Sequence, residues 1–393
     1  MRVTNIGIRK ILNSGGKPSF ESEVTINDSY VGVGSSPSAI AAGNREQPAS
    51  IIQDGLRYEA DNSLTRILNA ILTTPDITQT KLDQTLFENI DTFGSDLTLA
   101  ISLAFARANA KSHNIELVQY IENETGIKSA NQTPFPLVTM FSGGKVHNRK
   151  SGDTFQNVMI TANTNNFLRA TEIILTMHNE VGKFVKENHL FVELGHSSGF
   201  VVKNMTTEQQ FDLVNRLAVR YGLQESISLA VDVAAEHLFR DGEYAFEGKM
   251  YSPCEFYNLI QHYTKKHGIS FVEDPFDPND TYNWEKLKCS SESLTIVGDD
   301  LFATQSEFIN DKLANAILIK MNQAGTLTNT LETVRIAKNK GLKTCVSHRS
   351  YETEDTFMCD LAVAINSDYI KIGGPLRGDR ISKYNRLSLL AMR

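Results

Sequence analysis

The sequence lacks long hydrophobic runs and any metal-finger arrangement of cysteines. No stretch reaches the ~18 apolar residues that span a membrane, and residues 1–8 alternate like a strand without a secretory hydrophobic region. The four cysteines, among 393 residues, show no CxxC spacing. We therefore expect a soluble, unprocessed protein of the reducing cytoplasm, with no membrane partner.

An excess of positive charge is also missing. The chain has 39 Lys and Arg against 46 Asp and Glu, a formal net charge of -7, and its basic residues are scattered. Nucleic-acid surfaces are usually basic and clustered, so we expect no nucleic-acid partner. The length is sufficient for two domains and a substantial core.

The first part of the chain resembles a small α+β domain. Alternating apolar runs predict an antiparallel meander over residues 3–11, 19–26 and 30–33, and apolar positions at helical spacing follow between residues 59 and 127. The Ser-, Gly- and Ala-rich segment 34–43 predicts a mobile loop. A turn-rich stretch at 131–136 divides the chain into predicted domains 1–130 and 131–393.

The second part repeats one pattern: a short apolar run, rich in β-branched residues, that ends in a polar or charged group. Six runs end in this way, at Asp232, Glu273, Asp299, Lys320, Ser347 and Lys371. The stretches between them are each long enough for one helix. The pattern predicts an α/β fold with a parallel βα barrel, whose active site lies at the C-terminal ends of the strands.

Three of these strand ends carry carboxylates. Separated carboxylates from Asp232, Glu273 and Asp299 are typical of a site for Mg²⁺, which prefers oxygen ligands. The alternative is that each acid caps a helix or forms an ion pair. Lys320 and Lys371 would be partly desolvated and close to cations, which would lower their pKa and suit one of them to act as a base. Their alternative role is that of salt-bridge partners.

Ser347 is followed by a group suited to an anion. Arg349 offers a planar guanidinium fork, and Ser350 offers a hydroxyl beside it. Together with His348, these residues predict a phosphate site.

These segments resemble the enolase family, whose glycolytic members interconvert 2-phosphoglycerate and phosphoenolpyruvate. The similarity covers nearly the whole chain. It is carried by Ser347-His348-Arg349-Ser350, Lys320-Met321-Asn322-Gln323, Glu273-Asp274-Pro275-Phe276, Gly298-Asp299-Asp300, Ala230-Val231-Asp232, Ile370-Lys371-Ile372-Gly373-Gly374 and the hairpin Asn13-Ser14-Gly15-Gly16.

The resemblance implies a modified eight-stranded βα barrel with an N-terminal α+β capping domain, two Mg²⁺ ions and an assembly of two or more copies. It assigns Asp232, Glu273 and Asp299 to the first Mg²⁺ and Ser38 to the second. Lys320 would be the base, and Lys371 would hold the substrate carboxylate. His348 would lie beside the substrate, whose phosphate Arg349 and Ser350 would bind. His147 resembles a loop histidine of the family.

The chain also departs from the family pattern. Enolases use two glutamates on the early barrel strands, and Asn157 and Ser197 stand at these places. Neither side chain can exchange a proton near neutral pH, and losing a general acid costs roughly 10²- to 10⁴-fold, so ordinary dehydration should be slow. His196 or His147 could replace the acid, because an imidazolium donates a proton near pH 7. Glu193 could do so only if its strand were shifted by one residue.

Two further departures concern assembly. Gly15 replaces an arginine usual in the hairpin, and the chain ends at Arg393, soon after Lys371. A homo-oligomer is expected, with the usual dimer contacts weakened.

Three functions remain open. The first is a Mg²⁺-dependent lyase acting on a small phosphorylated carboxylate. The second is a transferase similar to carboxyphosphonoenolpyruvate synthase of phosphonate biosynthesis, which acts on a phosphonylated carboxylate and needs the cationic residues but not the glutamates. The third is a pseudoenzyme that binds phosphoenolpyruvate or a protein; the retained lysines and carboxylates argue against it.

Overall fold

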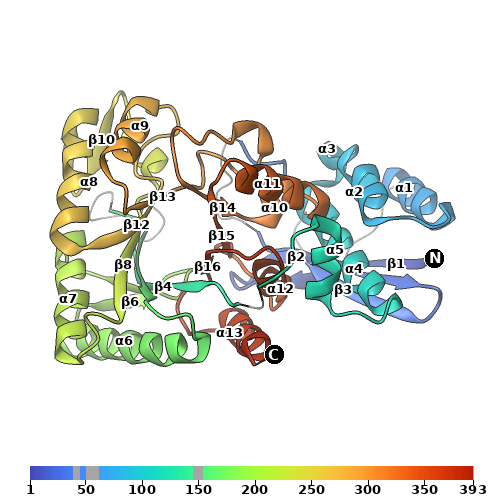
Figure 1. The fold of residues 1–393 in the computed structure, drawn as a ribbon, viewed down its shortest axis with the longest axis horizontal. Coiled ribbons are helices and arrows are strands. Elements are labelled where there is room, and N and C mark those ends of the chain that lie inside the picture. Colours follow the sequence, from blue (N-terminus) through green and yellow to red (C-terminus); the bar gives the residue numbers. More distant parts are fainter. Residues whose placement is uncertain (39–44, 50–61, 131, 145–153, 393) are drawn as a thin grey trace.

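The computed structural model describes residues 1–38, 45–49, 62–130, 132–144 and 154–392. Its N-terminal part begins with an antiparallel meander in the order β1-β2-β3, which confirms the predicted sheet. The strands are β1 (Val3–Leu12), β2 (Pro18–Ile26) and β3 (Tyr30–Ser35). Five helices accompany the sheet (Figure 1): α1 (Asn62–Thr73), α2 (Gln79–Phe87), α3 (Ile90–Phe93), α4 (Ser95–Ser112) and α5 (Leu117–Thr125).

Helix α4 packs on β3 because the strand carries two glycines. A Cβ atom at Gly32 would lie 2.1 Å from the Ala104 carbonyl oxygen, and one at Gly34 would lie 2.6 Å from that of Ala100. Only glycine permits so close an approach of two backbones. The alternation Val31-Gly32-Val33-Gly34 therefore turns both glycines toward α4 and allows the close contact between sheet and helix.

The second part is a closed, mixed barrel of eight strands. They are β4 (Phe135–Ser142), β5 (Asn157–Ala162), β8 (Ile227–Asp232), β12 (Ile269–Glu273), β13 (Thr295–Gly298), β14 (Ala316–Ile319), β15 (Lys343–Ser347) and β16 (Tyr369–Lys371). Strand β16 pairs with β4 and closes the barrel. Strand β5 runs antiparallel to both β4 and β8, and the other neighbours are parallel. The six predicted strands and the enolase-like barrel with an N-terminal α+β part are confirmed.

Helices cover the outside of the barrel (Figure 1). They are α6 (Phe167–Glu187), α7 (Thr207–Arg220), α8 (Pro253–His267), α9 (Thr281–Ser290), α11 (Leu327–Asn339), α12 (Phe357–Ala364) and α13 (Gly378–Ala391), with the short α10 (Met321–Ala324) after β14. Two small hairpin units complete the fold: β6 (Phe191–Leu194) with β7 (Phe200–Val202), and β9 (Phe239–Arg240) with β10 (Glu243–Phe246) and β11 (Lys249–Tyr251).

The interior of the barrel is a packed apolar cluster. Side chains from the barrel strands form it, including Met159, Phe271, Leu318 and Cys345, all fully buried. Cys345 is a free thiol, as its apolar strand predicted. Because side chains fill the barrel, a ligand site can form only at its ends.

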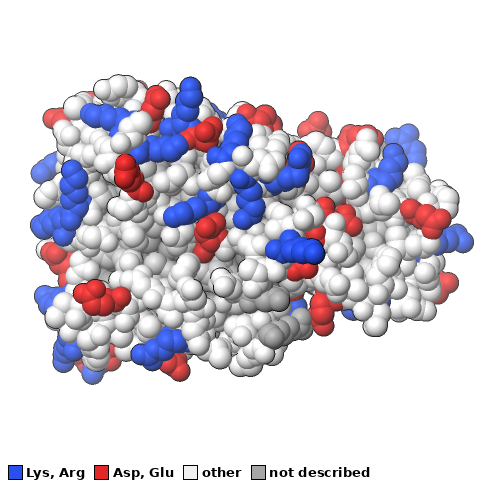
Figure 2. Space-filling model, in the orientation of Figure 1, with Lys and Arg blue, Asp and Glu red and all other residues white. Residues whose placement is uncertain are grey.

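The described helices include none that is both long and apolar enough to cross a membrane. On the face shown in Figure 2, basic and acidic side chains are interspersed, in keeping with the scattered charges of the sequence.

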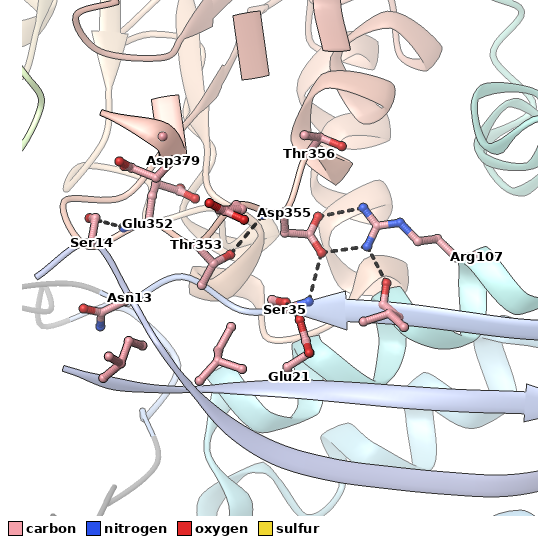
Figure 3. Close-up of a pocket in the computed structure, with 15 residues that line it drawn as sticks. Asn13, Ser14, Glu21, Ser35, Arg107, Glu352, Thr353, Asp355, Thr356 and Asp379 are labelled. Carbon is pink, nitrogen blue, oxygen red and sulfur yellow. Dashed lines mark hydrogen bonds and ion pairs between the residues drawn. The ribbon is translucent and has the colours of Figure 1, made fainter. Parts of the chain in front are cut away.

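A partly buried ion pair joins the two parts of the chain. Both guanidinium nitrogens of Arg107 on α4 donate to Asp355, at 2.6 and 2.7 Å, and the backbone N–H of Ser35 donates to the same carboxylate at 2.9 Å. The pair lines a cleft of about 650 Å³ between the meander and the segment 352–356 (Figure 3).

We predict that Asp355→Asn lowers the free energy of unfolding by about 3 kcal/mol, because it leaves the Arg107 charge without its partner. Urea denaturation would measure the change. The control is Asp91→Asn at an exposed position of α3, which should change stability by less than about 0.5 kcal/mol. Equal effects of the two substitutions would contradict the assignment.

The same pair makes stability depend on pH. Burial alone would raise the pKa of Asp355, but the Arg107 charge outweighs it and lowers that pKa. The unfolded chain then binds the proton more readily, so the stabilisation is present above about pH 4 and is lost as the pH falls through the lowered pKa. Asp355→Asn should flatten this acid limb of the stability profile.

Candidate active site

Asp232, Glu273 and Lys371 meet at the C-terminal ends of their strands. Glu273 lies beside Asp232 in the register of β12 and β8. Lys371 ends β16, which neighbours only β15 and β4, so its side chain reaches across the mouth of the barrel. Its Nζ donates to Asp232 Oδ2 at 2.8 Å and to the two Glu273 oxygens at 2.7 and 2.8 Å. All three side chains are buried.

A second ion pair lies beside the first. Lys320, directly after β14, pairs with Asp299, which follows β13. Gln323 on α10 donates to the other Asp299 oxygen at 3.2 Å. The mouth therefore holds two lysine–carboxylate groups from five different strand ends.

Arg349 forms the third ion pair. Its Nη2 donates to the two Glu46 oxygens at 2.9 and 3.1 Å. Its Nη1 is buried and has no hydrogen-bond partner among the described residues. Arg349, His348 and Ser350 all line a cavity of about 90 Å³ together with Lys320 and Lys371.

His348 is in a strongly cationic setting. Burial, reinforced by the Arg380 and Lys371 charges, holds the pKa of His348 well below its usual value. The imidazole is therefore neutral at pH 7, with Nδ1 lying 3.0 Å from the Arg349 carbonyl oxygen.

Asn157 and Ser197 form a neutral wall of the same cavity. Asn157 begins β5 opposite Asp232 in the antiparallel register, and its Nδ2 donates to Asp232 Oδ2 at 3.0 Å. Gln156 donates to the same oxygen at 3.0 Å. Ser197 lies in the loop between β6 and β7, where its carbonyl oxygen accepts from the Gly374 N–H at 2.7 Å.

The other predicted residues in the described part of the chain do not line this cavity. The His196 ring packs edge-on against Tyr351, with 5.1 Å between centroids. Ser38 forms an isolated antiparallel bridge with Tyr351, and its Oγ accepts from Asn13 at 2.9 Å. Glu193 is exposed on β6, paired with Val201. His147 lies outside the described residues, as does most of the predicted loop 34–43, and the roles of these residues stay predictions.

One expectation about the lysines, that their pKa values would be lowered, was wrong. Burial and neighbouring cations do favour a neutral amine, but the Asp299 carboxylate outweighs them and raises the pKa of Lys320. Asp232 and Glu273 likewise raise the pKa of Lys371. Both lysines are therefore ammonium ions here. The sequence showed that cations gather at the mouth but not which carboxylate each would contact.

Burial also acts on the acids. Burial and the Asp232 charge raise the pKa of Glu273, partly opposed by Lys371. For Asp299 burial acts in the same direction, but the Lys320 charge outweighs it and lowers the pKa. In both cases the neighbouring lysine favours the ionised form of the carboxyl group, Lys371 for Glu273 and Lys320 for Asp299.

The described residues contain one compact acidic group that could hold a metal ion, formed by Asp274, Asp299 and Asp300. Only Asp299 belongs to the predicted ligand set. Both Asp274 oxygens accept backbone N–H groups, those of Asp299 and Asp300, at 2.9 Å each. These two bonds indicate that Asp274 stabilises the loop that begins at Asp299. The predicted ligands Asp232 and Glu273 instead bond to Lys371.

Several residues of the site were missed from the sequence. Gln323 belongs to a segment quoted above and Gln156 directly precedes Asn157, so their amide donors beside predicted ligands were an available signal. Glu46 is separated from Arg349 by 303 residues and had no local signal. Arg380, fully buried on α13, donates to the carbonyl oxygens of His196, Arg349 and Ser350 and so joins the two sides of the cavity.

Comparison with known proteins agrees with this geometry. Residues 3–121 match the family model "Enolase, N-terminal domain" and residues 130–391 match "Enolase, C-terminal TIM barrel domain". Enolase of Campylobacter jejuni strain 81-176 is 32% identical over 405 aligned positions, covering 98% of this chain and 96% of the relative. Enolase of Campylobacter jejuni subsp. doylei is 33% identical with the same coverage. This chain belongs to the enolase family.

Proposed function

We propose that the protein is a Mg²⁺-dependent enzyme that acts on a small phosphorylated carboxylate of the 2-phosphoglycerate and phosphoenolpyruvate type. The observation that supports this most is the arrangement of cations around one cavity. Lys320, Lys371 and Arg349 all line this cavity, and Nη1 of Arg349 has no hydrogen-bond partner among the described residues. A substrate with one phosphate and one carboxylate matches these charges.

The donors suit a hard divalent cation. Asp232, Glu273 and Asp299 would hold it, because they are carboxylates from three adjacent strands that already pair with ammonium groups, the first two with Lys371 and the third with Lys320. A bound Mg²⁺ would stabilise the negative charge that develops on the substrate carboxylate when an enolate forms.

Lys320 is the proposed base for the proton next to the substrate carboxylate. The Arg349 and Lys371 charges already act to lower its pKa, and the Asp299 and Glu273 charges act against them. If Asp299 and Glu273 bound a Mg²⁺ ion instead of the lysines, Lys320 would be left among cations, where the neutral amine is favoured. Lys371 would hold the substrate carboxylate, and Arg349 with Ser350 would bind the phosphate.

The neutral wall favours a second candidate within the same chemistry. Asn157 and Ser197 cannot donate a proton to a departing hydroxide near neutral pH. A transferase that uses phosphoenolpyruvate-like substrates, similar to carboxyphosphonoenolpyruvate synthase, needs no such acid. The cavity therefore suits enolate formation better than dehydration.

We predict that the protein exchanges the C2 proton of 2-phosphoglycerate in D₂O with Mg²⁺ while it forms phosphoenolpyruvate slowly. Proton NMR would follow exchange, and ultraviolet absorbance would follow the product. Lys320→Ala should reduce exchange by roughly 10²-fold or more, since it removes the base. Lys312→Ala, at an exposed position, is the matched control and should exchange normally.

If the protein dehydrated 2-phosphoglycerate at the rate of an ordinary enolase, the proposal that Asn157 and Ser197 make dehydration slow would be wrong. Mg²⁺-dependent binding without any exchange would instead support the binding-only alternative and contradict the proposed enzyme.

A second prediction separates the two candidate ligand sets. Asp232→Asn should weaken Mg²⁺ binding about 10-fold or more, measured by isothermal titration calorimetry, because it removes a proposed ligand. Asp300→Asn removes a nearby charge that belongs only to the compact acidic group, and it should weaken binding much less. The reverse order of effects would place the ion at Asp274, Asp299 and Asp300.

A further inference from the structure

Glu46 enters the candidate active site from the N-terminal part of the chain. Its carboxylate receives Arg349 Nη2 at 2.9 and 3.1 Å and Gln323 Nε2 at 3.2 Å. Its side chain is only 7% exposed, and that of Arg349 is 5% exposed. A carboxylate of the protein thus already lies on the guanidinium that would bind the substrate phosphate.

The residues next to Glu46 hold it there. Arg45 Nη1 donates to the Leu301 carbonyl oxygen at 2.6 Å, and its guanidinium lies 4.9 Å from the centre of the Phe308 ring. The Gln47 N–H donates to the Gln323 carbonyl oxygen at 3.2 Å. One residue later, the Pro48 carbonyl oxygen accepts from the Ser95 N–H at 2.7 Å. Residues 45–48 are therefore anchored on the barrel mouth and on α4, with Glu46 directed inward.

The guanidinium is only partly used by this contact. Nη2 makes both bonds to Glu46, while Nη1 is buried without a partner among the described residues. A phosphate normally takes two parallel N–H groups of an arginine. A phosphate that binds end-on, across Nη1 and Nη2, would meet the Glu46 carboxylate at Nη2, and two anions this close in a buried site repel strongly.

We propose that Glu46 is an internal competitor that occupies the anion position of Arg349 and must leave it when a phosphate-bearing ligand binds. This inference rests on the proposed function, in which Arg349 receives the substrate phosphate. Glu46 keeps the buried arginine paired in the absence of ligand, since an unpaired buried charge is costly. It also sets selectivity, because a ligand must bind Arg349 better than the protein's own carboxylate does. A phosphate dianion does so, whereas a second carboxylate gains nothing.

The test is the affinity of the Glu46→Gln variant for phosphate ligands. Isothermal titration calorimetry with Mg²⁺ would measure the dissociation constants of phosphoenolpyruvate, inorganic phosphate and glycerate. The amide oxygen of the variant would still accept a hydrogen bond from Arg349, so the fold should be kept, but the amide carries no charge. We expect phosphoenolpyruvate and inorganic phosphate to bind about 10-fold more tightly or better, and glycerate to change less.

Two controls complete the design. Glu307→Gln removes one negative charge from an exposed position that follows the same barrel strand as Asp299, and it should leave all three affinities unchanged. Glu46→Ala removes the competing carboxylate and leaves no acceptor in its place. If circular dichroism shows that this variant is folded, it should also bind phosphate ligands more tightly than the unchanged protein.

The outcomes are distinguishable. If the unchanged protein binds phosphoenolpyruvate and Glu46→Gln binds it equally or more weakly, Glu46 orients Arg349 instead of competing with the ligand, and this inference alone is overturned. If neither the unchanged protein nor any variant binds a phosphate ligand with Mg²⁺, the proposed function fails and takes the inference with it.

Discussion

The structure depends on pairing the buried cations Lys320, Lys371 and Arg349 at the mouth of the barrel. Lys320, Lys371 and Arg349 each face carboxylates, and these side chains are at most 14% exposed. Removing charges from water costs several kcal/mol for each ion, and only close, well-bonded partners offset the cost. The lysine pKa values rise for this reason. Under the proposed function, a ligand that enters must replace existing partners, so ion binding and proton transfer would be coupled to breaking ion pairs.

The N-terminal part of the chain is a component of the site. The segment 348–356 receives contacts from it at several points: Arg349 from Glu46, Tyr351 from Ser38, Glu352 from Ser14 and Asp355 from Arg107. On the opposite side Lys383 pairs with Glu352 at 3.0 Å, and Arg380 bonds the carbonyl oxygens behind Arg349. The segment has little regular structure of its own. Its position, and with it the predicted phosphate site, is determined by contacts from both ends of the chain.

Much of this could be predicted from the sequence because strand ends obey a simple rule. An apolar run that ends in a charged residue places that residue at the rim of a parallel barrel, so Asp232, Glu273 and Lys371 were identified together. The partner of each charge could not be predicted in the same way. Lys371 reaches across the barrel, and Glu46 comes from 303 residues away, so neither contact has a sequence spacing. The wrong expectation for the lysine pKa values has this origin: the sign depends on the nearest partner, which only the fold determines.

Asn157 lines the neutral wall of the cavity and also contacts a proposed metal ligand, Asp232. Asp232 Oδ2 accepts three donors, from Gln156 and Asn157 at 3.0 Å and from Lys371 at 2.8 Å. A carboxylate at position 157 would turn an acceptor toward this oxygen, and two like charges in a buried site repel. The amide instead donates to Asp232 and holds its carboxylate in a fixed orientation. Under the proposed function, this one hydrogen bond would link the neutral wall of the cavity to the proposed metal site.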